Sequence, residues 1–465
     1  MPIRTRIGIF LIAVALAAPV AAQSLTDAER SQIDSAVKAV VDATGSPSAS
    51  IAVVRDGQIV YEHAYGIAAM PEIAARSDMR YAIGSVTKQF TASAILLLQE
   101  DGKLSLDDTV AKWFPNLTRA SEVTVRQLLS MTSGYQDYWP QDYVFMDMQR
   151  PSPASEIMQR WAGKALDFDP GTKWQYSNTN YVIAGSIVEK VSGMKLMQFL
   201  QQRIFTPLKM TSVVDFDAGP LGPNDAAPLL RNAVGPFRRA PKEAAGWLFG
   251  AGHLAMTAHD LSLWNISIIN RSLLKPASYQ AMQTDTLLAS GIATGYGLGV
   301  QTRSVGGRRR LSHGGAVSGY TTSNIVYPDD KVAITVYTNI YPGAADAPGS
   351  IADRISRVIL TPPPANAEAL ARAQSIYANL AKGSIDRYLF TPAANAFFAD
   401  EVLNDYAKSL GALGAPTEFT STGESLRGGM VIRSYRIRAG GVVLDLTMMV
   451  LPDGKIDQFI VSRAG

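Results

Sequence analysis

The sequence contains no cysteine and only four histidines, and these shortages exclude several kinds of site. Without cysteine the chain has no disulfide framework, no thiol nucleophile and no attachment site for a lipoprotein anchor. The histidines form no closely spaced ligand pair, which argues against a dedicated zinc site. No Gly-x-Ser-x-Gly motif occurs, so the chain lacks the nucleophile turn of an α/β-hydrolase.

The chain also carries little net charge, with 43 basic and 40 acidic side chains and a formal charge of +3. Its first 22 residues have the composition of a secretory signal peptide, because Arg4 and Arg6 precede an apolar run that ends in Val-Ala-Ala. That run is too short to anchor the protein in a membrane. We therefore expect cleavage after Ala22 and a periplasmic or secreted protein without a membrane anchor. Loss of the two arginines lowers the formal charge from +3 to +1, which argues against nucleic acid as a partner.

Residues 85–99 form the most distinctive stretch, S-V-T-K-Q-F-T-A-S-A-I-L-L-L-Q. It contains no glycine or proline and is apolar around most of its circumference, which predicts a helix buried on nearly all sides. Ser85 and Lys88 lie one turn apart and share a face. Burial would lower the lysine pKa, so that the neutral amine could take the hydroxyl proton. The alternative is an N-cap serine followed by a surface lysine.

Two further Ser-x-x-Lys patterns occur, at Ser35/Lys38 and at Ser192/Lys195. The first lies on a predicted amphipathic helix, residues 26–43, where a solvated lysine is expected. The second lies at the end of a predicted helix. We interpret both as structural.

A second element, Tyr176-Ser-Asn178, precedes a predicted helix over residues 179–191 and follows a Pro-Gly-Thr turn. The turn indicates that Tyr176 is presented from a loop. A phenol beside a serine–lysine pair can relay protons to a leaving group. The Asn178 amide can orient a substrate carbonyl and bond the lysine.

The third element is His313-Gly314-Gly315, which follows a predicted strand over residues 309–312. The two glycines would allow a ligand to approach the backbone closely. The N–H of Ala316, together with that of Ser85, could form an oxyanion hole. The alternative is a strand bulge with His313 as a satisfied surface residue.

Strand patterns occur along the chain both before and after a region in which helices predominate. They predict a single sheet that combines strands from the two ends, with the helices as an insertion between them. The expected strands cover residues 49–55, 58–65, 297–303, 309–312, 321–327 and 331–339, and a helix over 350–360 follows. The run Thr-Pro-Pro-Pro within residues 361–365 is expected to be a linker between domains. Beyond it we expect a small α+β domain, with helices over 366–380 and 395–410 and strands over 430–438, 442–450 and 455–462.

Three motifs follow one another along the chain: Ser85-x-x-Lys88, Tyr176-x-Asn178 and His313-x-Gly315. Their order and spacing resemble those of the penicillin-recognising serine hydrolases, specifically the class C β-lactamase-like branch. The resemblance covers about residues 49–360 and implies a β-lactamase/transpeptidase-like α/β fold, an antiparallel sheet flanked by helices plus an all-helical subdomain. Further similar segments are residues 102–107, 125–129, 132–134, 250–252, 257–261, 296–299 and 327–330.

The resemblance also implies roles for these residues. Ser85 would be acylated, Lys88 and Tyr176 would share the proton transfers, and Asn178 would hold the acyl amide of the substrate. His313, Gly315 and Ala316 would belong to the substrate-binding strand.

The third motif departs from the pattern of true β-lactamases. His313 stands where that branch usually carries the lysine of Lys-Thr-Gly, and Gly314 replaces the threonine. Part of the expected carboxylate clamp is therefore missing, and a lone histidine is mostly neutral at pH 7. Both changes argue against efficient β-lactam hydrolysis and against recognition of a C-terminal D-alanine.

The leading hypothesis is an exported serine hydrolase without a cofactor or metal, which acts on small esters or amides through an acyl-enzyme. The alternatives are a D-amino-acid-specific peptidase or DD-carboxypeptidase, a class C-like β-lactamase, and an idle binding or sensor protein. The domains expected are a signal peptide (1–22), a hydrolase domain (23–360), the linker (361–365) and an accessory domain (366–465). The last loosely resembles cone-shaped folds of the nuclear-transport-factor type, and such a domain could bind a ligand, cap the site or form a homo-oligomer.

Overall fold

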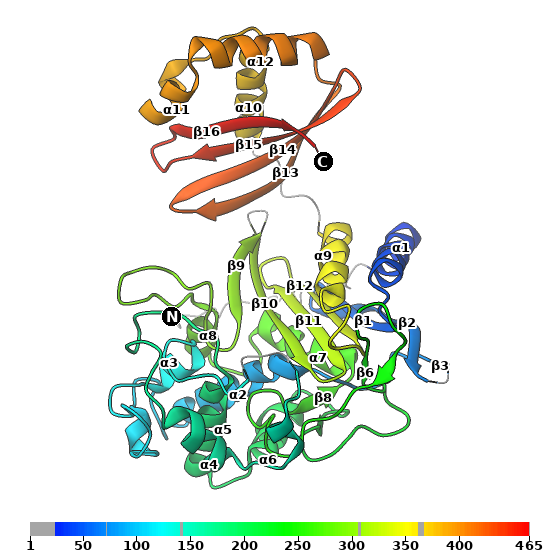
Figure 1. Ribbon diagram of the computed structural model, residues 1–465, viewed down its shortest axis with the longest axis vertical. Helices are drawn as coiled ribbons and strands as arrows, with labels where there is room; N and C mark the ends of the chain where they lie inside the picture. The colour runs from blue at the N-terminus through cyan, green and yellow to red at the C-terminus, as the bar shows by residue number, and fades with distance from the viewer. Residues whose placement is uncertain (1–23, 71, 140–142, 306–307, 361–366, 465) are drawn as a thin grey trace, which may run out of the picture.

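A seven-stranded antiparallel sheet lies at the centre of the larger part of the chain (Figure 1). The computed structural model describes residues 24–70, 72–139, 143–305, 308–360 and 367–464, so the expected signal peptide and Pro-rich linker lie outside the described residues. The strand order is β3-β2-β1-β12-β11-β10-β9, which joins strands from both sides of the helical region as predicted. The strands are β1 (Ser48–Arg55), β2 (Gln58–Ala69), β3 (Ile73–Ala74), β9 (Gln301–Val305), β10 (Arg308–Val317), β11 (Tyr320–Tyr327) and β12 (Val332–Thr338).

The middle of this sheet is covered on both faces, which explains its continuous apolar strands. One face packs against α1 (Asp27–Thr44) and α9 (Ala347–Ile359), and the other against α7 (Ala258–Asn270). The predicted N-terminal helix is confirmed, including a capping box between Thr26 and Glu29. Strands β1 and β2 pair as a hairpin, and Asp56 and Gly57 at its turn both adopt positive φ angles.

The helical region is organised around α2 (Thr87–Glu100), and every residue from Thr87 to Leu98 is buried. Each fully buried large apolar side chain of this helix contributes about 1.5–3 kcal/mol to folding. The surrounding helices are α3 (Val125–Leu129), α4 (Ala154–Ile157), α5 (Asn178–Ser192), α6 (Leu196–Leu200) and α8 (Pro276–Gln283), with π-helical turns at Met158–Ala162 and Gln201–Phe205. Short strands connect them: β4 (Tyr81–Ala82), β5 (Val214–Asp215), β6 (Leu229–Leu230), β7 (Arg238–Arg239) and β8 (Leu254–Met256).

Three details differ from the sequence predictions. The strand expected to end at residue 312 continues as β10 through His313 to Val317, because β11 pairs with it along that whole length. The strand expected over 297–303 begins only at Gln301. Ser85 lies in a 3₁₀ turn, Gly84–Val86, directly before α2 rather than inside its first α-helical turn.

The C-terminal part is a four-stranded antiparallel sheet with helices on one face. The strand predicted over residues 442–450 is confirmed, and buried residues alternate with half-buried ones along it. The helix expected over 395–410 is instead two helices that meet at Phe398 and Ala399, and a polar edge strand, β13, precedes the three predicted strands. The elements are α10 (Ala367–Leu380), α11 (Pro392–Phe397), α12 (Asp400–Leu413), β13 (Glu418–Arg427), β14 (Met430–Ala439), β15 (Val442–Val450) and β16 (Ile456–Arg463).

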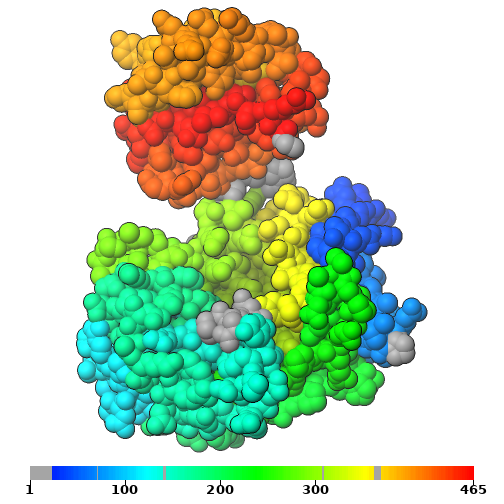
Figure 2. All heavy atoms as spheres, viewed as in Figure 1, coloured from blue at the N-terminus to red at the C-terminus, as the bar shows by residue number. Residues whose placement is uncertain are grey.

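Figure 2 shows this C-terminal part, in orange and red, as a body separate from the larger one. Strand β13 of the C-terminal part contacts strand β9 of the larger part. Its likeness to a nuclear-transport-factor cone stays a prediction. Within the described residues, no helix has both the length and the apolar character needed to cross a membrane.

Candidate active site

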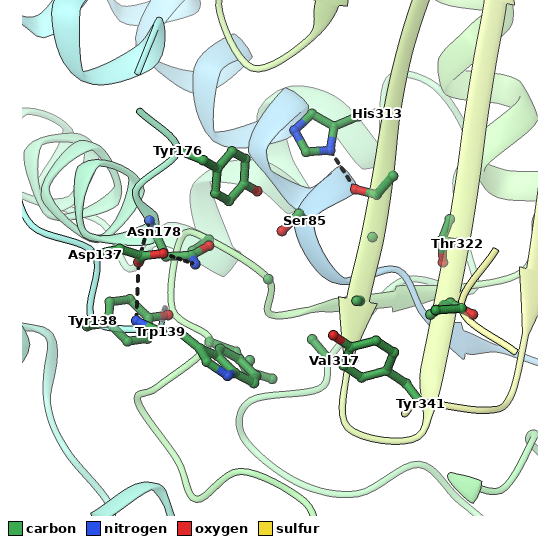
Figure 3. Close-up of a pocket in the computed structure, with 18 of the residues that line it drawn as sticks. Ser85, Asp137, Tyr138, Trp139, Tyr176, Asn178, His313, Val317, Thr322 and Tyr341 are labelled. Atoms are coloured by element: carbon green, nitrogen blue, oxygen red, sulfur yellow. Dashed lines mark hydrogen bonds between the residues drawn. The ribbon is translucent and has the colours of Figure 1, made fainter. Parts of the chain in front are cut away.

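Ser85 lies where the turn before α2 meets strand β10. Gly84 has a φ of 50°, and a Cβ built there would lie 2.7 Å from the backbone nitrogen of Ala316. A side chain at residue 84 would therefore force the turn and the strand apart. The close approach places Ser85 beside the strand that carries His313, Gly315 and Ala316, as Figure 3 shows.

Lys88 is fully buried one helical turn after Ser85. Its Nζ lies 2.9 Å from Ser85 Oγ, 2.8 Å from Asn178 Oδ1 and 2.9 Å from the carbonyl oxygen of Ala251. Burial lowers the pKa of Lys88 to about 7, although the charge of Asp137 opposes the shift. The alternative of a surface lysine is wrong, and a substantial fraction of Lys88 is a neutral amine at neutral pH.

These contacts decide how the neutral amine is oriented. The oxygens of Asn178 and Ala251 can only accept hydrogen bonds, so they take the two N–H groups of a neutral amine. The lone pair then faces Ser85, whose hydroxyl donates its hydrogen bond to Nζ. This is the arrangement that a general base requires for removing the hydroxyl proton.

Tyr176 projects from the loop before α5 toward Ser85 (Figure 3). The Nζ of Lys88 lies 5.0 Å from the centre of its ring. Asn178 is the first residue of α5, so the loop and the helix start present both side chains to the serine. The structure therefore brings together all four residues of the first two motifs.

His313 is buried on β10, with 4% of its surface exposed, so its interpretation as a surface residue is wrong. Its Nδ1 lies 2.6 Å from the carbonyl oxygen of Gly314, which can only accept, so Nδ1 carries the proton. Its Nε2 then accepts a hydrogen bond of 2.9 Å from the Tyr296 hydroxyl. Burial, followed by the nearby Lys88 charge, lowers the pKa of His313 to about 4. The side chain is a neutral part of the wall and supplies no positive charge.

The next residues on β10 contact the turn that holds Ser85. A Cβ at Gly315 would lie 2.0 Å from the carbonyl oxygen of Ile83 and 3.3 Å from the backbone nitrogen of Ser85. Ala316 is exposed toward the pocket on the same strand. This contact and the approach of Gly84 to Ala316 bring the strand close to the backbone nitrogens of both Ser85 and Ala316, while an oxyanion hole formed by their N–H groups stays a prediction.

Asp137 is a pocket residue that belongs to none of the three sequence motifs. Its Oδ1 accepts the backbone N–H groups of Asn178, at 2.9 Å, and Trp139, at 3.2 Å. Its Oδ2 lies 3.3 Å from Asn178 Nδ2, which fixes the amide so that its oxygen faces Lys88. Burial raises the pKa of Asp137 while these N–H groups oppose the shift. The sequence around it, Tyr-Gln-Asp-Tyr-Trp, is rich in aromatic residues and carries no signal of these contacts.

One pocket of about 620 Å³ is lined by Ser85, Asp137, Tyr176, Asn178 and His313, together with Gly315 and Ala316 of β10, whereas the fully buried Lys88 is not among its lining residues. Tyr138 and Trp139 form part of its wall (Figure 3), whereas Trp247 is buried in the core beneath it. Among the residues that line it and that the structure describes, Asp137 is the one with a carboxylate, and none is a lysine or an arginine. No group of three His, Cys, Asp or Glu side chains suited to a metal ion occurs among the described residues.

The two further Ser-x-x-Lys patterns lie outside the pocket, in agreement with their interpretation as structural. Ser35 and Lys38 are exposed on α1, and the side chain of Lys195 is 85% exposed. Tyr-x-Asn also recurs, at Tyr337 in a strand and at Tyr377 in a helix, and both tyrosines are buried in hydrophobic cores.

Comparisons with known proteins agree with this geometry. The family model described as Beta-lactamase matches residues 33–355. The chain is 28% identical over 327 residues to a D-aminopeptidase of Brucella canis, which covers 68% of this chain and 60% of that protein. It is also 28% identical over 299 residues to penicillin-binding protein 4* of Bacillus subtilis, and this alignment covers 61% of this chain and 66% of that protein. The chain therefore spans less than two thirds of the length of these curated relatives.

Solved structures show the same fold. A D-stereospecific amidohydrolase from Streptomyces sp. superposes with a TM-score of 0.60 at 25% identity, covering 69% of this chain and 96% of that one. An octameric penicillin-binding protein homologue from Pyrococcus abyssi superposes with a TM-score of 0.64 at 20% identity. The superposition covers 95% of this chain and 97% of that one. The second likeness concerns the fold alone and extends over both parts of the chain. Because the family model matches well over half of the sequence, the chain belongs to the Beta-lactamase family and is a serine hydrolase of that fold.

Proposed function

We propose that this protein is an exported amidase or aminopeptidase that cleaves the amide bond after an amino-terminal D-residue through an acyl-enzyme on Ser85. The substrate carries a free α-ammonium group, which the Asp137 carboxylate binds. This proposal narrows the hypothesis of an esterase or amidase to substrates with a positive charge beside the reacting carbonyl.

The charge of the pocket is the observation that carries the proposal. Asp137 supplies a carboxylate on the wall formed with Asn178, while His313 on the opposite strand is neutral. A substrate carboxylate would meet no fixed cation from the described lining residues, whereas an ammonium group would gain a charge-assisted hydrogen bond. The pocket therefore favours the amino end of a peptide over its carboxyl end.

The reaction follows from the contacts of Ser85. Neutral Lys88 takes the hydroxyl proton as Ser85 Oγ bonds to the substrate carbonyl carbon, and the N–H groups of Ser85 and Ala316 stabilise the oxyanion. The C–N bond then breaks while Tyr176 passes the proton to the leaving nitrogen. A water molecule hydrolyses the acyl-enzyme by the reverse sequence of proton transfers.

The relatives support the substrate class. One matched protein is named a D-aminopeptidase and one a D-stereospecific amidohydrolase. Export is supported by the signal-like composition of residues 1–22. A cone fold for the C-terminal domain is supported by helices that cover one face of its sheet.

The direct test compares the two enantiomers of phenylalanine p-nitroanilide, using the mature protein and a Ser85→Ala control. We expect kcat/KM to be highest for the D-isomer with a free amino group, and turnover to disappear in Ser85→Ala. Mass spectrometry should locate an acyl adduct on the peptide that contains Ser85. Equal rates for the two enantiomers, or turnover that survives Ser85→Ala, would contradict the proposal.

A second comparison isolates the role of Asp137. Asp137→Asn is expected to lower kcat/KM for the free amine about 10- to 100-fold, the value of one hydrogen bond to a charged group. The N-acetylated substrate serves as the matched control, because it has no positive charge. A purely structural role, through the orientation of Asn178, would lower the rates of both substrates equally and would refute the ammonium contact.

A further inference from the structure

A second cavity, of about 540 Å³, lies in the helical region and is lined by residues of α4, α5, α6 and β5 and of the segment over residues 246–253. Its lining residues are all different from those of the catalytic pocket. The two cavities share one wall, however. Leu248, Ala251 and Gly252 face the catalytic pocket, while Phe249 and His253 face the second cavity.

His253 is one of the polar residues that line this cavity, and 2% of its surface is exposed. Neither of its ring nitrogens has a hydrogen-bond partner among the described residues. Burial lowers the pKa of His253 to about 4, so at neutral pH the ring has one N–H group and one bare nitrogen. A buried polar group left without a partner costs about 1–3 kcal/mol, and a ligand that meets it recovers this energy.

Two neighbouring carboxylates lie in the same cavity. Asp217 accepts the backbone N–H groups of Gly246 and Leu248, yet burial, together with the charge of Asp215, raises its pKa to about 6. Lys242 offsets part of this effect. Asp215 uses a single oxygen, Oδ1, for the backbone N–H groups of Asp217 and Ala218. These three side chains therefore combine negative charge with a bare imidazole nitrogen.

The two lysines at this cavity are directed to other partners. Lys190 donates to the carbonyl oxygen of Trp113, 2.8 Å away, and lies over the ring of Phe114. Lys195 is largely exposed and faces Glu189. The remaining walls are apolar and consist mainly of Phe114, Met158, Leu196, Met197 and Phe249.

We propose that this cavity is a second binding site, for a primary ammonium ion that carries an apolar, aryl-sized body. The ammonium group donates to the bare nitrogen of His253 and faces the carboxylates of Asp215 and Asp217. The apolar body packs against the aromatic and methionine side chains of the walls. A cation at this place relieves the repulsion between the two carboxylates, which a neutral ligand does not.

Calorimetric titration of the mature protein with 2-phenylethylammonium chloride tests the site, and 2-phenylethanol is the uncharged control. Asp137→Asn removes the ammonium contact in the catalytic pocket, so one binding event is expected to remain in that variant. Adding His253→Leu or Asp215→Asn to it should weaken this remaining event at least tenfold. The alcohol should bind at least tenfold more weakly than the amine.

Both added substitutions are chosen to preserve the fold. Asparagine keeps the oxygen that holds the turn at residue 215, and His253→Leu removes two unpartnered polar atoms, so its melting temperature should not fall. The inference is overturned if Asp137→Asn abolishes all binding, or if His253→Leu and Asp215→Asn leave the remaining event unchanged. Binding that is insensitive to Asp137→Asn but lost in His253→Leu would refute the ammonium contact in the catalytic pocket and leave this site standing.

Discussion

Replacing Gly315 with alanine is expected to lower kcat about 100- to 1000-fold. The new Cβ would lie 2.0 Å from the carbonyl oxygen of Ile83 and 2.9 Å from its carbonyl carbon, both backbone atoms that no side-chain rotation can move. Strand β10 and the turn before α2 must therefore separate by about 1 Å. A displacement of that size costs about 100-fold in rate, and loss of one oxyanion donor costs about 100- to 1000-fold.

The neighbouring Gly314 provides the matched control, because a Cβ there would lie 3.7 Å from its nearest contact, the carbonyl oxygen of Thr322. Gly314→Ala should keep kcat within about threefold of the wild type. Both variants can be measured with a neutral p-nitrophenyl ester, alongside their melting temperatures. Overpacking at Gly315 should cost about 1–3 kcal/mol of stability without unfolding the domain. The reasoning is refuted if Gly315→Ala retains near-normal kcat, or if Gly314→Ala loses as much.

Three further predictions concern ionisable groups. Lys88→Ala should lower kcat for an ester about 100- to 10,000-fold, because it removes the base. Lys38→Ala, on the exposed face of α1, is the control and should leave ester turnover unchanged. Equal effects of the two substitutions would contradict the assignment of Lys88 as the base. With a neutral ester, kcat/KM should fall as the pH drops through about 7, because protonation of Lys88 removes the base, and a profile flat to pH 5 would exclude it. The pKa of His313 is lowered from 6.5 to about 4, so the unfolded chain binds more protons between these values. The free energy of unfolding should therefore decrease as the pH is lowered from about 6.5 to about 4. Urea titrations at pH 7, 5.5 and 4.5 measure this decrease, which should be smaller in His313→Gln.

The helix around Ser85 and Lys88 could be predicted because its evidence is local. Fifteen residues without glycine or proline, apolar on nearly every side, fix both the helix and the burial of the lysine. Tyr176 and Asn178 could be placed for a similar reason, since the turn before them and the helix after them are visible in the sequence. The order of the motifs then identified the family.

Features that depend on distant pairing could not be predicted in the same way. The glycines after residue 312 suggested a strand end, but the pairs His313–Asn324 and Gly315–Thr322 keep the strand regular. Strand β13 is mostly polar and is held by its ladder to β14. Asp137 is the clearest case, because its role depends on an amide 41 residues later along the chain. A carboxylate in an aromatic loop carries no local signal of that contact.

Asp137 connects substrate recognition with the activation of the base, and this leads to a last prediction. Its negative charge raises the pKa of Lys88, in opposition to the effect of burial. An ammonium group bound to Asp137 would neutralise that charge and bring a second positive charge near Lys88, so both effects would lower the lysine pKa further. The acidic limb of kcat, which reports the enzyme–substrate complex, should therefore lie at lower pH for a D-aminoacyl anilide than for its N-acetyl analogue. If the two limbs coincide in single-turnover measurements of acylation from pH 5 to 9, the ammonium does not bind at Asp137. If the acidic limb for the D-aminoacyl anilide lies at lower pH, the bound substrate itself favours the neutral form of Lys88, which is the form that removes the proton from Ser85.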